Sequence, residues 1–274
     1  MILLVASNKD IASLTIKEQI LLHYPFTQTP ENFQNNPLYN ANINSDAVTL
    51  ATLNEESVQA QNLPEAFPAA KLIIFISRHS SQSGKPTLSV HTPGNLAQAE
   101  LGGLPRIVSV SSAKGMREAL KTLQRSRDQL SLDYEVSYEC THHGPSLGVP
   151  AMFVELGSSE LQWRDSTAAQ AVAHSAIAAI SNVSSLKESA VLGIGGPHYS
   201  EKFTRMALAG EAMFGHIIPK YAVSAIDPEM ILQCVERTLE KVSIAILDWK
   251  GIKSEDKPKL LAALHEAGLP FKKA

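Results

Sequence analysis

Short apolar runs alternate with amphipathic segments along most of the chain. The apolar runs predict β-strands, whereas apolar positions that recur every three or four residues predict helices. The predicted strands cover residues 2–6, 71–76, 88–91, 106–110, 132–140, 149–156, 190–194, 215–218 and 242–247. The predicted helices cover residues 10–22, 114–130, 166–180, 200–209, 228–240 and 257–267. Strands that alternate with helices are typical of an α/β protein with a mainly parallel sheet.

Residues 132–140 show a clear period of two. Alternate side chains of a strand point to opposite faces, so one face of this segment is predicted to be apolar. The side chains on that face are Leu132, Tyr134, Val136, Tyr138 and Cys140.

Residues 27–44 are rich in Asn, Gln and Pro and are predicted to form a loop. The rhythm of strands and helices resumes after this segment without a change in composition, so it does not resemble an interdomain linker. We therefore predict one catalytic domain over residues 1–274. Its fold is a three-layer sandwich, in which a mixed, mainly parallel sheet lies between layers of helices.

Composition limits the classes of partner. The formal net charge of −3 argues against extensive duplex binding, because nucleic-acid binders usually carry an excess of basic residues. A contact with RNA must therefore rest on a local patch. Two cysteines, Cys140 and Cys234, predict a reducing, cytoplasmic setting rather than a disulfide framework. No apolar run reaches the ~20 residues of a membrane span, and residues 1–7 do not resemble a signal peptide, so no membrane partner is expected.

Histidines follow several of the predicted strands. Apart from His23, which directly follows the first predicted helix, and His265, which lies in the last, seven of the nine histidines lie elsewhere in the chain. In α/β sheets, ligands bind beyond the carboxyl ends of the strands, so residues distant in sequence can converge there. We therefore expect one pocket that contains imidazoles from several strand ends. The histidines concerned are His79, His91, His142, His143, His198 and His216.

His142 and His143 are adjacent and precede a turn at Gly144 and Pro145. In a straight strand the two rings would face opposite sides, but the turn can bring them together. Neutral imidazole is a common zinc ligand, so the pair is a candidate metal site. The alternative is that one of them is a hydrogen-bonded turn residue, because the spacing matches no established zinc motif.

Two further segments combine polar groups with a predicted strand end. His79 lies between Arg78 and Ser80, a setting that suits phosphate or carboxylate binding, although a polar surface loop is an equal alternative. A serine-hydrolase mechanism is weakly supported, because no Gly-x-Ser-x-Gly elbow is present. Gly195 and Gly196 form a turn whose N–H groups can bind an anion. Alone, this turn is more typical of a tight strand exit than of a phosphate loop.

Glu155 ends an apolar run and is a candidate metal ligand or general base, with a solvated strand end as the alternative. His174 lies among alanines in a predicted helix and is interpreted as structural. His23 and His265 are interpreted as surface residues. Cys140 belongs to the apolar face and is interpreted as a buried side chain rather than a thiolate ligand.

Six short motifs occur in order along the chain. They are Ser-Arg-His-Ser at 77–80, His-Thr-Pro-Gly-Asn at 91–95, Glu-Cys-Thr-His-His-Gly-Pro at 139–145, Phe-Val-Glu-Leu-Gly-Ser at 153–158, Gly-Gly-Pro-His-Tyr at 195–199 and Gly-His-Ile-Ile-Pro-Lys-Tyr at 215–221. Together they resemble the archaeal and plant type of D-aminoacyl-tRNA deacylase. The resemblance runs from residue 1 to about residue 221, and the number and order of the motifs make it specific.

This resemblance implies hydrolysis of the ester that joins a D-amino acid to the 3′-terminal ribose of tRNA. It also implies a zinc-dependent monomer with two ions per subunit that binds the acceptor end of D-aminoacyl-tRNA. The implied fold is similar to that of peptidyl-tRNA hydrolase and the nucleoside phosphorylases. A zinc-bound water ionises near pH 7 and would supply the nucleophile.

The motifs then provide candidate residues for each role. The candidate metal ligands are His142, His143, His198 and His216. The candidate catalytic residues are His79, Glu155 and His142, with Glu155 or His79 accepting the proton of water. The candidate substrate-binding residues are Arg78, His91, Gly195, Gly196, Tyr199, Lys202 and Lys220. The Pro-Gly and Gly-Pro turns are candidate sources of a backbone wall that distinguishes D from L side chains.

Three alternatives stay open at this point. In the first, the neighbouring ribose hydroxyl and backbone donors carry out the same reaction without a protein metal. In the second, the chain is a nucleoside phosphorylase-like enzyme that acts on a small molecule. In the third, it binds the tRNA 3′ end without catalysis. The number of histidines at predicted strand ends favours an enzyme.

Overall fold

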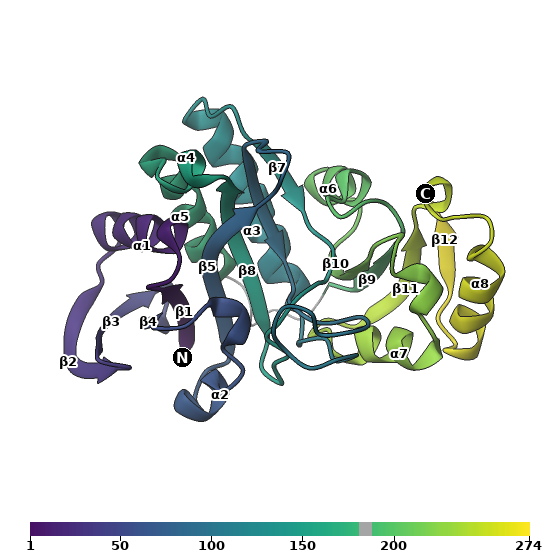
Figure 1. The fold of residues 1–274 in the computed structure, drawn as a ribbon, viewed down its shortest axis with the longest axis horizontal. Helices are drawn as coiled ribbons and strands as arrows, with labels where there is room; N and C mark the ends of the chain where they lie inside the picture. The colour runs from purple at the N-terminus through teal and green to yellow at the C-terminus, as the bar shows by residue number, and fades with distance from the viewer. Residues whose placement is uncertain (181–187) are drawn as a thin grey trace.

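The computed structural model describes residues 1–180 and 188–274, and its strands form two sheets (Figure 1). The larger sheet has eight strands in the order β2-β3-β4-β1-β5-β8-β6-β7. They are β1 (Ile2–Ser7), β2 (Thr27–Phe33), β3 (Asn36–Ile43), β4 (Asp46–Leu53), β5 (Leu72–Ser80), β6 (Thr87–His91), β7 (Glu135–Tyr138) and β8 (Ala151–Ser158). Parallel pairs outnumber antiparallel ones, so the predicted α/β class with a mixed, mainly parallel sheet is confirmed.

The smaller sheet has the order β10-β9-β11-β12, and every neighbouring pair is parallel. Its strands are β9 (Ala190–Ile194), β10 (Phe214–Ile218), β11 (Val242–Leu247) and β12 (Phe271–Lys273). The segment after β7 joins the two sheets: Cys140 N donates to His198 O at 2.9 Å, and Thr141 N donates to Ile217 O at 2.8 Å. The sequence pattern did not indicate this division of the strands, and the prediction of one domain stays a prediction.

Helices cover one face of the larger sheet. The longer helices α1, α3 and α5 pack on the face that carries Leu4, Ile74 and Val154. The opposite face carries Phe75 and Phe153 and is covered by α2 and loops. The helices are α1 (Ile11–His23), α2 (Leu63–Ala66), α3 (Ala113–Gln129), α4 (Glu160–Trp163), α5 (Ser166–Ile180), α6 (Glu201–Leu208), α7 (Pro228–Glu236) and α8 (Lys257–Glu266). Because both faces are covered, β5 and β8 are almost continuously apolar over their first residues.

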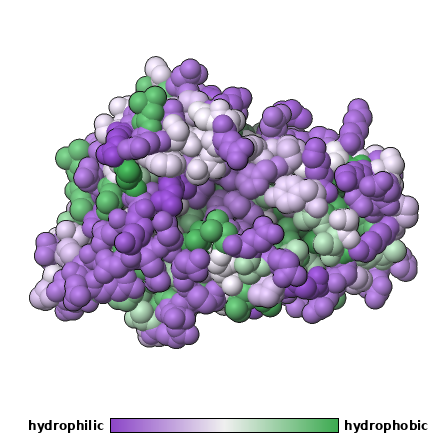
Figure 2. Space-filling model, viewed as in Figure 1, coloured by the Kyte–Doolittle hydropathy of each residue, from purple (hydrophilic) through white to green (hydrophobic). Residues whose placement is uncertain are grey.

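Hydrophilic residues cover most of the molecular face seen in Figure 2, which agrees with apolar cores enclosed between layers. None of the helices in residues 1–180 and 188–274 has both the length and the apolar character that crossing a membrane requires.

Asp10 connects the first helix to the strand that carries His79. Its carboxylate caps α1 by accepting from Ser13 N at 3.0 Å, and it also accepts from Arg78 N at 2.7 Å. This second bond holds the end of β5 in place one residue before the histidine. The cap is itself buried, with 3% of Asp10 exposed, so water competes little for these bonds.

The predicted loop over residues 27–44 is wrong, because these residues form the antiparallel strands β2 and β3. Gln34 and Asn35, both with positive φ, make the turn between them. The hairpin lies at the edge of the sheet, and most of its side chains are exposed or half-buried. Backbone pairing therefore forms these strands without the apolar alternation on which the prediction depended.

The predicted strand over residues 106–110 is also wrong. Only isolated bridges form there, from Val108 to Gly94 and from Val110 to Pro150. Arg106 has a φ of 55°, which is incompatible with an extended strand. In contrast, the predicted apolar face of residues 132–140 is confirmed, since its five side chains all pack in or against the core of the larger sheet.

Candidate active site at the junction of the sheets

Five of the nine histidines come together where the two sheets meet. His91 is the last residue of β6, and His142 and His143 follow β7, whereas His198 follows β9 of the smaller sheet. The centroid of the His142 ring lies 4.3 Å from those of His91 and His143 and 4.4 Å from that of His198. His79, at the end of β5, joins this group through shared carboxylates. The structure therefore brings these sequence-distant imidazoles into one place.

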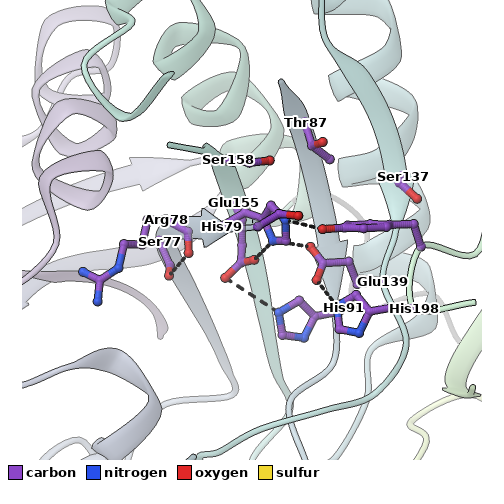
Figure 3. Close-up of polar contacts among 12 residues, drawn as sticks. Ser77, Arg78, His79, Thr87, His91, Ser137, Glu139, Glu155, Ser158 and His198 are labelled. Carbon is purple, nitrogen blue, oxygen red and sulfur yellow. Dashed lines mark hydrogen bonds and ion pairs between the residues drawn. The ribbon is translucent and has the colours of Figure 1, made fainter. Parts of the chain in front are cut away.

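Two buried carboxylates lie on either side of His79 (Figure 3). Its Nδ1 is 3.2 Å from Glu139 Oε1 and 3.6 Å from Glu155 Oε2. Its Nε2 lies 2.6 Å from the hydroxyl of Tyr199. Glu139 also contacts His198, with 2.8 Å between Oε2 and Nε2. Only 1% of Glu139 and 3% of Glu155 are exposed, so these charges act on each other with little screening by water.

A glycine makes room for the His79 ring. His79 and Gly157 are partners in neighbouring strands β5 and β8. A Cβ atom at position 157 would lie 2.6 Å from His79 Cβ and 2.6 Å from its carbonyl oxygen. The absence of a side chain at Gly157 therefore allows the ring to lie where it reaches both carboxylates.

The carboxylates determine which imidazoles are charged. Burial by itself lowers the pKa of His79, but hydrogen bonds and charges from Glu139 and Glu155 outweigh burial and raise that pKa to about 11. Burial also lowers the pKa of His198, but hydrogen bonds to Cys140 and Glu139 outweigh burial and raise that pKa to about 10. Both rings therefore carry a proton at neutral pH.

The carboxylates themselves are ionised. Burial raises the pKa of each carboxyl group, but hydrogen bonds from His198 and His79 bring the pKa of Glu139 well below its ordinary value. A hydrogen bond from His79 and the nearby His91, whose Nε2 lies 3.7 Å from Glu155 Oε1, lower the pKa of Glu155 in the same way. Two carboxylates and two imidazolium rings thus balance each other inside the site.

The imidazoles of His142 and His143 are neutral. Burial, together with the neighbouring His91, lowers the pKa of His142 well below its ordinary value and that of His143 to about 4. His142 Nδ1 contacts Cys140 O at 2.8 Å, and His143 Nδ1 contacts Gly144 O at 2.7 Å. These contacts leave the Nε2 atom of each ring without a hydrogen bond, although His142 Nε2 lies 3.6 Å from Glu139 Oε2. Neutral imidazole with one nitrogen held by a carbonyl is the form in which histidine binds metals.

Among residues 1–180 and 188–274, three groups of side chains have the spacing of a metal site. Each group places its ligand atoms within 4.8 Å of one another. The groups are His91 with His142 and His143, Cys140 with His142 and His198, and His79 with Glu139 and Glu155. The first group fits a cation best, because neither nitrogen of the buried His91 forms a hydrogen bond to a described residue; Nε2 only lies 3.7 Å from Glu155 Oε1. His79 and His198 carry protons that a metal would have to displace.

Two cavities lie on the two sides of the His142 and His143 pair. The first has a volume of 340 Å³ and is lined by all five clustered histidines except His91, together with both buried carboxylates. The second has a volume of 470 Å³ and a more apolar lining that includes Leu96 and the ring of Tyr221. Leu101 borders both. The imidazole pair is therefore accessible from two adjoining spaces.

Some predicted residues lie near the cluster but already have partners. Arg78 lines the first cavity, and its guanidinium donates to both carboxylate oxygens of Glu56 at 3.0 Å. His216 is fully buried outside the cluster: its Nδ1 lies 3.1 Å from Thr141 Oγ1 and its Nε2 lies 3.1 Å from Arg237 O. Burial lowers the pKa of His216 to about 4, so it is a neutral packing residue at this position.

The glycines and lysines of the predicted substrate site lie along the edge of the smaller sheet instead. Gly195 and Gly196 have φ values of 103° and 79° and form a tight exit from β9. The ammonium of Lys202 contacts Asp248 Oδ1 at 2.6 Å, and Lys220 is exposed beyond β10. None of these four residues is among those that line the two cavities.

Glu139 was not predicted as a site residue, although the sequence contained a signal for it. Residues 132–140 place alternate apolar side chains on the core, which puts Glu139 on the opposite face with Ser137. A carboxylate on the polar face of a strand that leads directly into two histidines is placed to contact them. The structure also confirms the interpretation of His174, whose ring lies outside the site and contacts the Tyr24 hydroxyl at 2.6 Å.

Comparisons with known proteins identify related chains. The family model described as D-aminoacyl-tRNA deacylase matches residues 66–272. The D-aminoacyl-tRNA deacylase of Thermococcus kodakarensis is 37% identical over 268 residues, which cover 96% of each chain. The protein of the same name from Thermococcus onnurineus is 35% identical over 98% of each chain.

Solved structures show a similar fold. The crystal structure of a conserved protein of unknown function, AF0625, has a TM-score of 0.88 and 29% identity, covering 100% of this chain and 95% of its own. The 5′-methylthioadenosine/S-adenosyl homocysteine nucleosidase of Campylobacter jejuni has a TM-score of 0.43 and 12% identity over 66% of this chain and 98% of its own. The second likeness is too low to support a conclusion about fold or activity.

Proposed function

The chain belongs to the D-aminoacyl-tRNA deacylase family, and we infer that its histidine and carboxylate cluster hydrolyses the ester between a D-amino acid and the 3′-terminal ribose of tRNA. The observation that carries this proposal is the contact of His79 with two buried carboxylates beside the neutral pair His142 and His143. Such a site contains both charged proton carriers and free nitrogen ligands. Ester hydrolysis needs an activated water, a stabilised oxyanion and a proton for the leaving oxygen.

We propose that His91, His142 and His143 hold a zinc ion. Their ligand nitrogens have suitable spacing, and a cation would be a partner for one of the two His91 nitrogens that form no hydrogen bond to a described residue. A bound zinc ion would supply a Lewis acid that brings the pKa of a water molecule to about 7. Cys140 and His198 are candidate ligands for the second ion that the family resemblance implies, because the one free nitrogen of His142 serves the first ion.

Charge distinguishes the two candidate bases. His79 already carries its proton at neutral pH, so it has no lone pair with which to accept another. Glu155 is ionised, and its Oε2 atom lies 3.6 Å from His79 Nδ1. In the proposed reaction Glu155 accepts the proton of the attacking water. His79 is then the group that donates protons.

Tyr199 provides a path for the proton that leaves His79. Because both nitrogens of the His79 imidazolium are donors, Nε2 donates to the Tyr199 oxygen over 2.6 Å. The hydroxyl proton of Tyr199 is then free to pass to the 3′ oxygen of the ribose as the ester bond breaks. His79 keeps its Nδ1 proton and becomes neutral. Glu155 then releases its proton to water and His79 Nε2 takes one up from water through the Tyr199 hydroxyl, so the residues regain their starting charges.

We place the preference for D side chains at the backbone wall beside His143. Gly144 N donates to Leu101 O at 2.8 Å, and a Cβ atom on Gly144 would lie 2.2 Å from Gly103 N. Residues 101–103 and Gly144 therefore pack backbone against backbone next to the imidazole pair. A rigid wall of this kind admits one orientation of a side chain at the α-carbon and excludes its mirror image.

The test compares D- and L-aminoacyl-tRNA carrying the same side chain, with the wild type and His142→Ala. We expect hydrolysis of the D substrate only, and a loss of about 10²-fold or more in the variant. His174→Ala is the matched control, because His174 lies outside the cluster. Equal hydrolysis of both enantiomers would remove the proofreading role.

We also propose that the enzyme acts as a monomer in the cytoplasm. Sedimentation velocity tests the oligomeric state, and cell fractionation tests the location.

A further inference from the structure

Exposed and half-buried lysines lie along the carboxyl edge of the smaller sheet. All strands of this sheet are parallel, so the ends of β10, β9, β11 and β12 lie along one edge. His198 follows β9 at the same edge, and the chain leaves β11 into Trp249. We define the lysine edge as five residues that lie at or close to these strand ends. They are Lys202, Lys220, Lys250, Lys257 and Lys273.

The local charge differs from that of the whole chain. Residues 241–274 contain seven Lys against four Asp or Glu, a formal charge of +3, whereas the whole chain has −3. The remainder of the chain, residues 1–240, therefore carries −6. A basic patch on an acidic protein is the arrangement that binds polyanions at one place and repels them elsewhere.

Trp249 holds two of these lysines together without neutralising them. The ammonium of Lys273 lies 3.8 Å from the centroid of the indole, and that of Lys257 lies 4.6 Å from it. Within the described residues, no carboxylate forms an ion pair with Lys220, Lys250, Lys257 or Lys273.

The acidic groups nearby are mostly committed to other contacts. Asp248 pairs with Lys202 at 2.6 Å, and Glu255 pairs with Lys253 at 3.8 Å. Asp256 lies at the N-terminal cap position of α8, and its side chain forms no capping hydrogen bond. Lys220, Lys250 and Lys273 are exposed and have no ion pair with a carboxylate of the described residues, so their charge is available to a ligand.

The lysine edge is continuous with the active site. A Cβ atom on Gly195 would lie 2.9 Å from Asp248 O, so the turn that leads to His198 packs on the turn that leads to Trp249. On the other side, Lys220 N donates to Gly196 O at 2.8 Å, and the next residue, Tyr221, lines the second cavity. The lysine edge therefore lies next to the second cavity, with Lys220 adjacent in sequence to the cavity residue Tyr221.

We propose that the lysine edge binds the phosphodiester backbone of the tRNA acceptor end while the terminal ester lies at the histidines. This inference rests on the proposed function, because it takes tRNA as the substrate. Neighbouring strands are about 4.8 Å apart, so the edge from β9 to β12 spans about 10 Å. Stacked nucleotides repeat every ~3.4 Å along a strand, so the edge can contact the phosphates of about three consecutive nucleotides.

The experiment measures binding of an uncharged RNA minihelix that ends in CCA, by fluorescence anisotropy at several salt concentrations. We expect Lys250→Glu with Lys273→Glu to weaken binding at least tenfold at 0.15 M salt. Loss of two phosphate contacts should also reduce the slope of log Kd against log salt by about 1.4. The matched control is Lys71→Glu with Lys241→Glu, which changes the same charge at the amino ends of β5 and β11.

Substitution of the same two lysines by Ala, with thermal unfolding of each variant, separates lost contacts from lost folding. The proposal would be overturned if Lys71→Glu with Lys241→Glu weakened minihelix binding as much as Lys250→Glu with Lys273→Glu does. An unchanged salt slope in the latter variant would also overturn it. A second assay uses the D-aminoacyl ester of adenosine, which lacks the acceptor stem. Its turnover should be unchanged in Lys250→Glu with Lys273→Glu. If the wild type fails to hydrolyse any D-aminoacyl ester, the proposed function fails, whereas the minihelix result still tests RNA binding at this edge.

Discussion

The imidazole of His91 lies flat against the ring of Phe153, with centroids 5.1 Å apart and planes within 8° of each other. Phe153 is paired with His91 across β8 and β6, so the sheet register determines this contact. His91 forms no hydrogen bond to a described residue, and its Nε2 lies 3.7 Å from Glu155 Oε1. Stacking on Phe153 therefore contributes to the ring orientation that a hydrogen bond usually fixes in a metal-ligating histidine.

We expect Phe153→Leu to weaken zinc binding by about 10- to 100-fold, because it frees the His91 ring to rotate. The measurement is zinc affinity by competition with a chromogenic chelator. Phe203→Leu is the control, since Phe203 is a buried ring that packs on Phe214 away from the histidines. Similar zinc affinities for the two variants would contradict the orienting role.

Removal of metal should abolish turnover. We expect exhaustive treatment with a chelator to reduce the hydrolysis of D-aminoacyl-tRNA by about 10²-fold or more, and added zinc to restore it. His91→Ala should retain less zinc than the wild type under the same dialysis. Full activity in protein that elemental analysis finds free of metal would end the zinc mechanism. The ribose hydroxyl and backbone donors would then have to carry out the reaction.

Replacement of Glu139 tests the charge balance of the site. Glu139→Gln removes the carboxylate that His79 and His198 share, so the pKa of His79 should fall and kcat should drop by about 10²-fold. The pKa is followed by NMR of the imidazole carbons. Glu135→Gln is the control, because Glu135 lies on the same strand but is exposed. A normal kcat in Glu139→Gln would exclude this carboxylate from catalysis.

The raised pKa of His79 also predicts how stability depends on pH. The folded-state pKa is about 11 and the ordinary value is 6.5, so the folded protein keeps a proton that the unfolded chain releases. This stabilisation is complete below pH 6.5 and is lost as the pH rises toward 11.

Between pH 7 and 10, the free energy of unfolding of the wild type should therefore fall relative to that of His79→Gln. The fall is at most about 1.4 kcal/mol per pH unit. Urea unfolding at several pH values measures the difference, with His174→Gln as the control. A difference that stays constant over this range would show that His79 has an ordinary pKa.

The strand pattern and the local chemistry were predictable from the sequence. The apolar run at 72–76 and the alternation at 132–140 each reflect a local period that burial imposes on a strand. The histidines were identifiable because they follow these runs directly. The hairpin at 27–43 was not predictable in this way, because backbone pairing at an exposed sheet edge leaves no apolar period.

Only the tertiary structure decided which of these histidines act together. His79 lies near the end of β5 and contacts two carboxylates, whereas His216 lies in the middle of β10 and contacts Thr141 and Arg237. Burial lowers the pKa of His216, but the two carboxylates outweigh burial at His79 and raise its pKa. Periodicity along a sequence reports which face of an element is buried. The charge and ligand capacity of a side chain depend on what the fold places within a few ångströms of it.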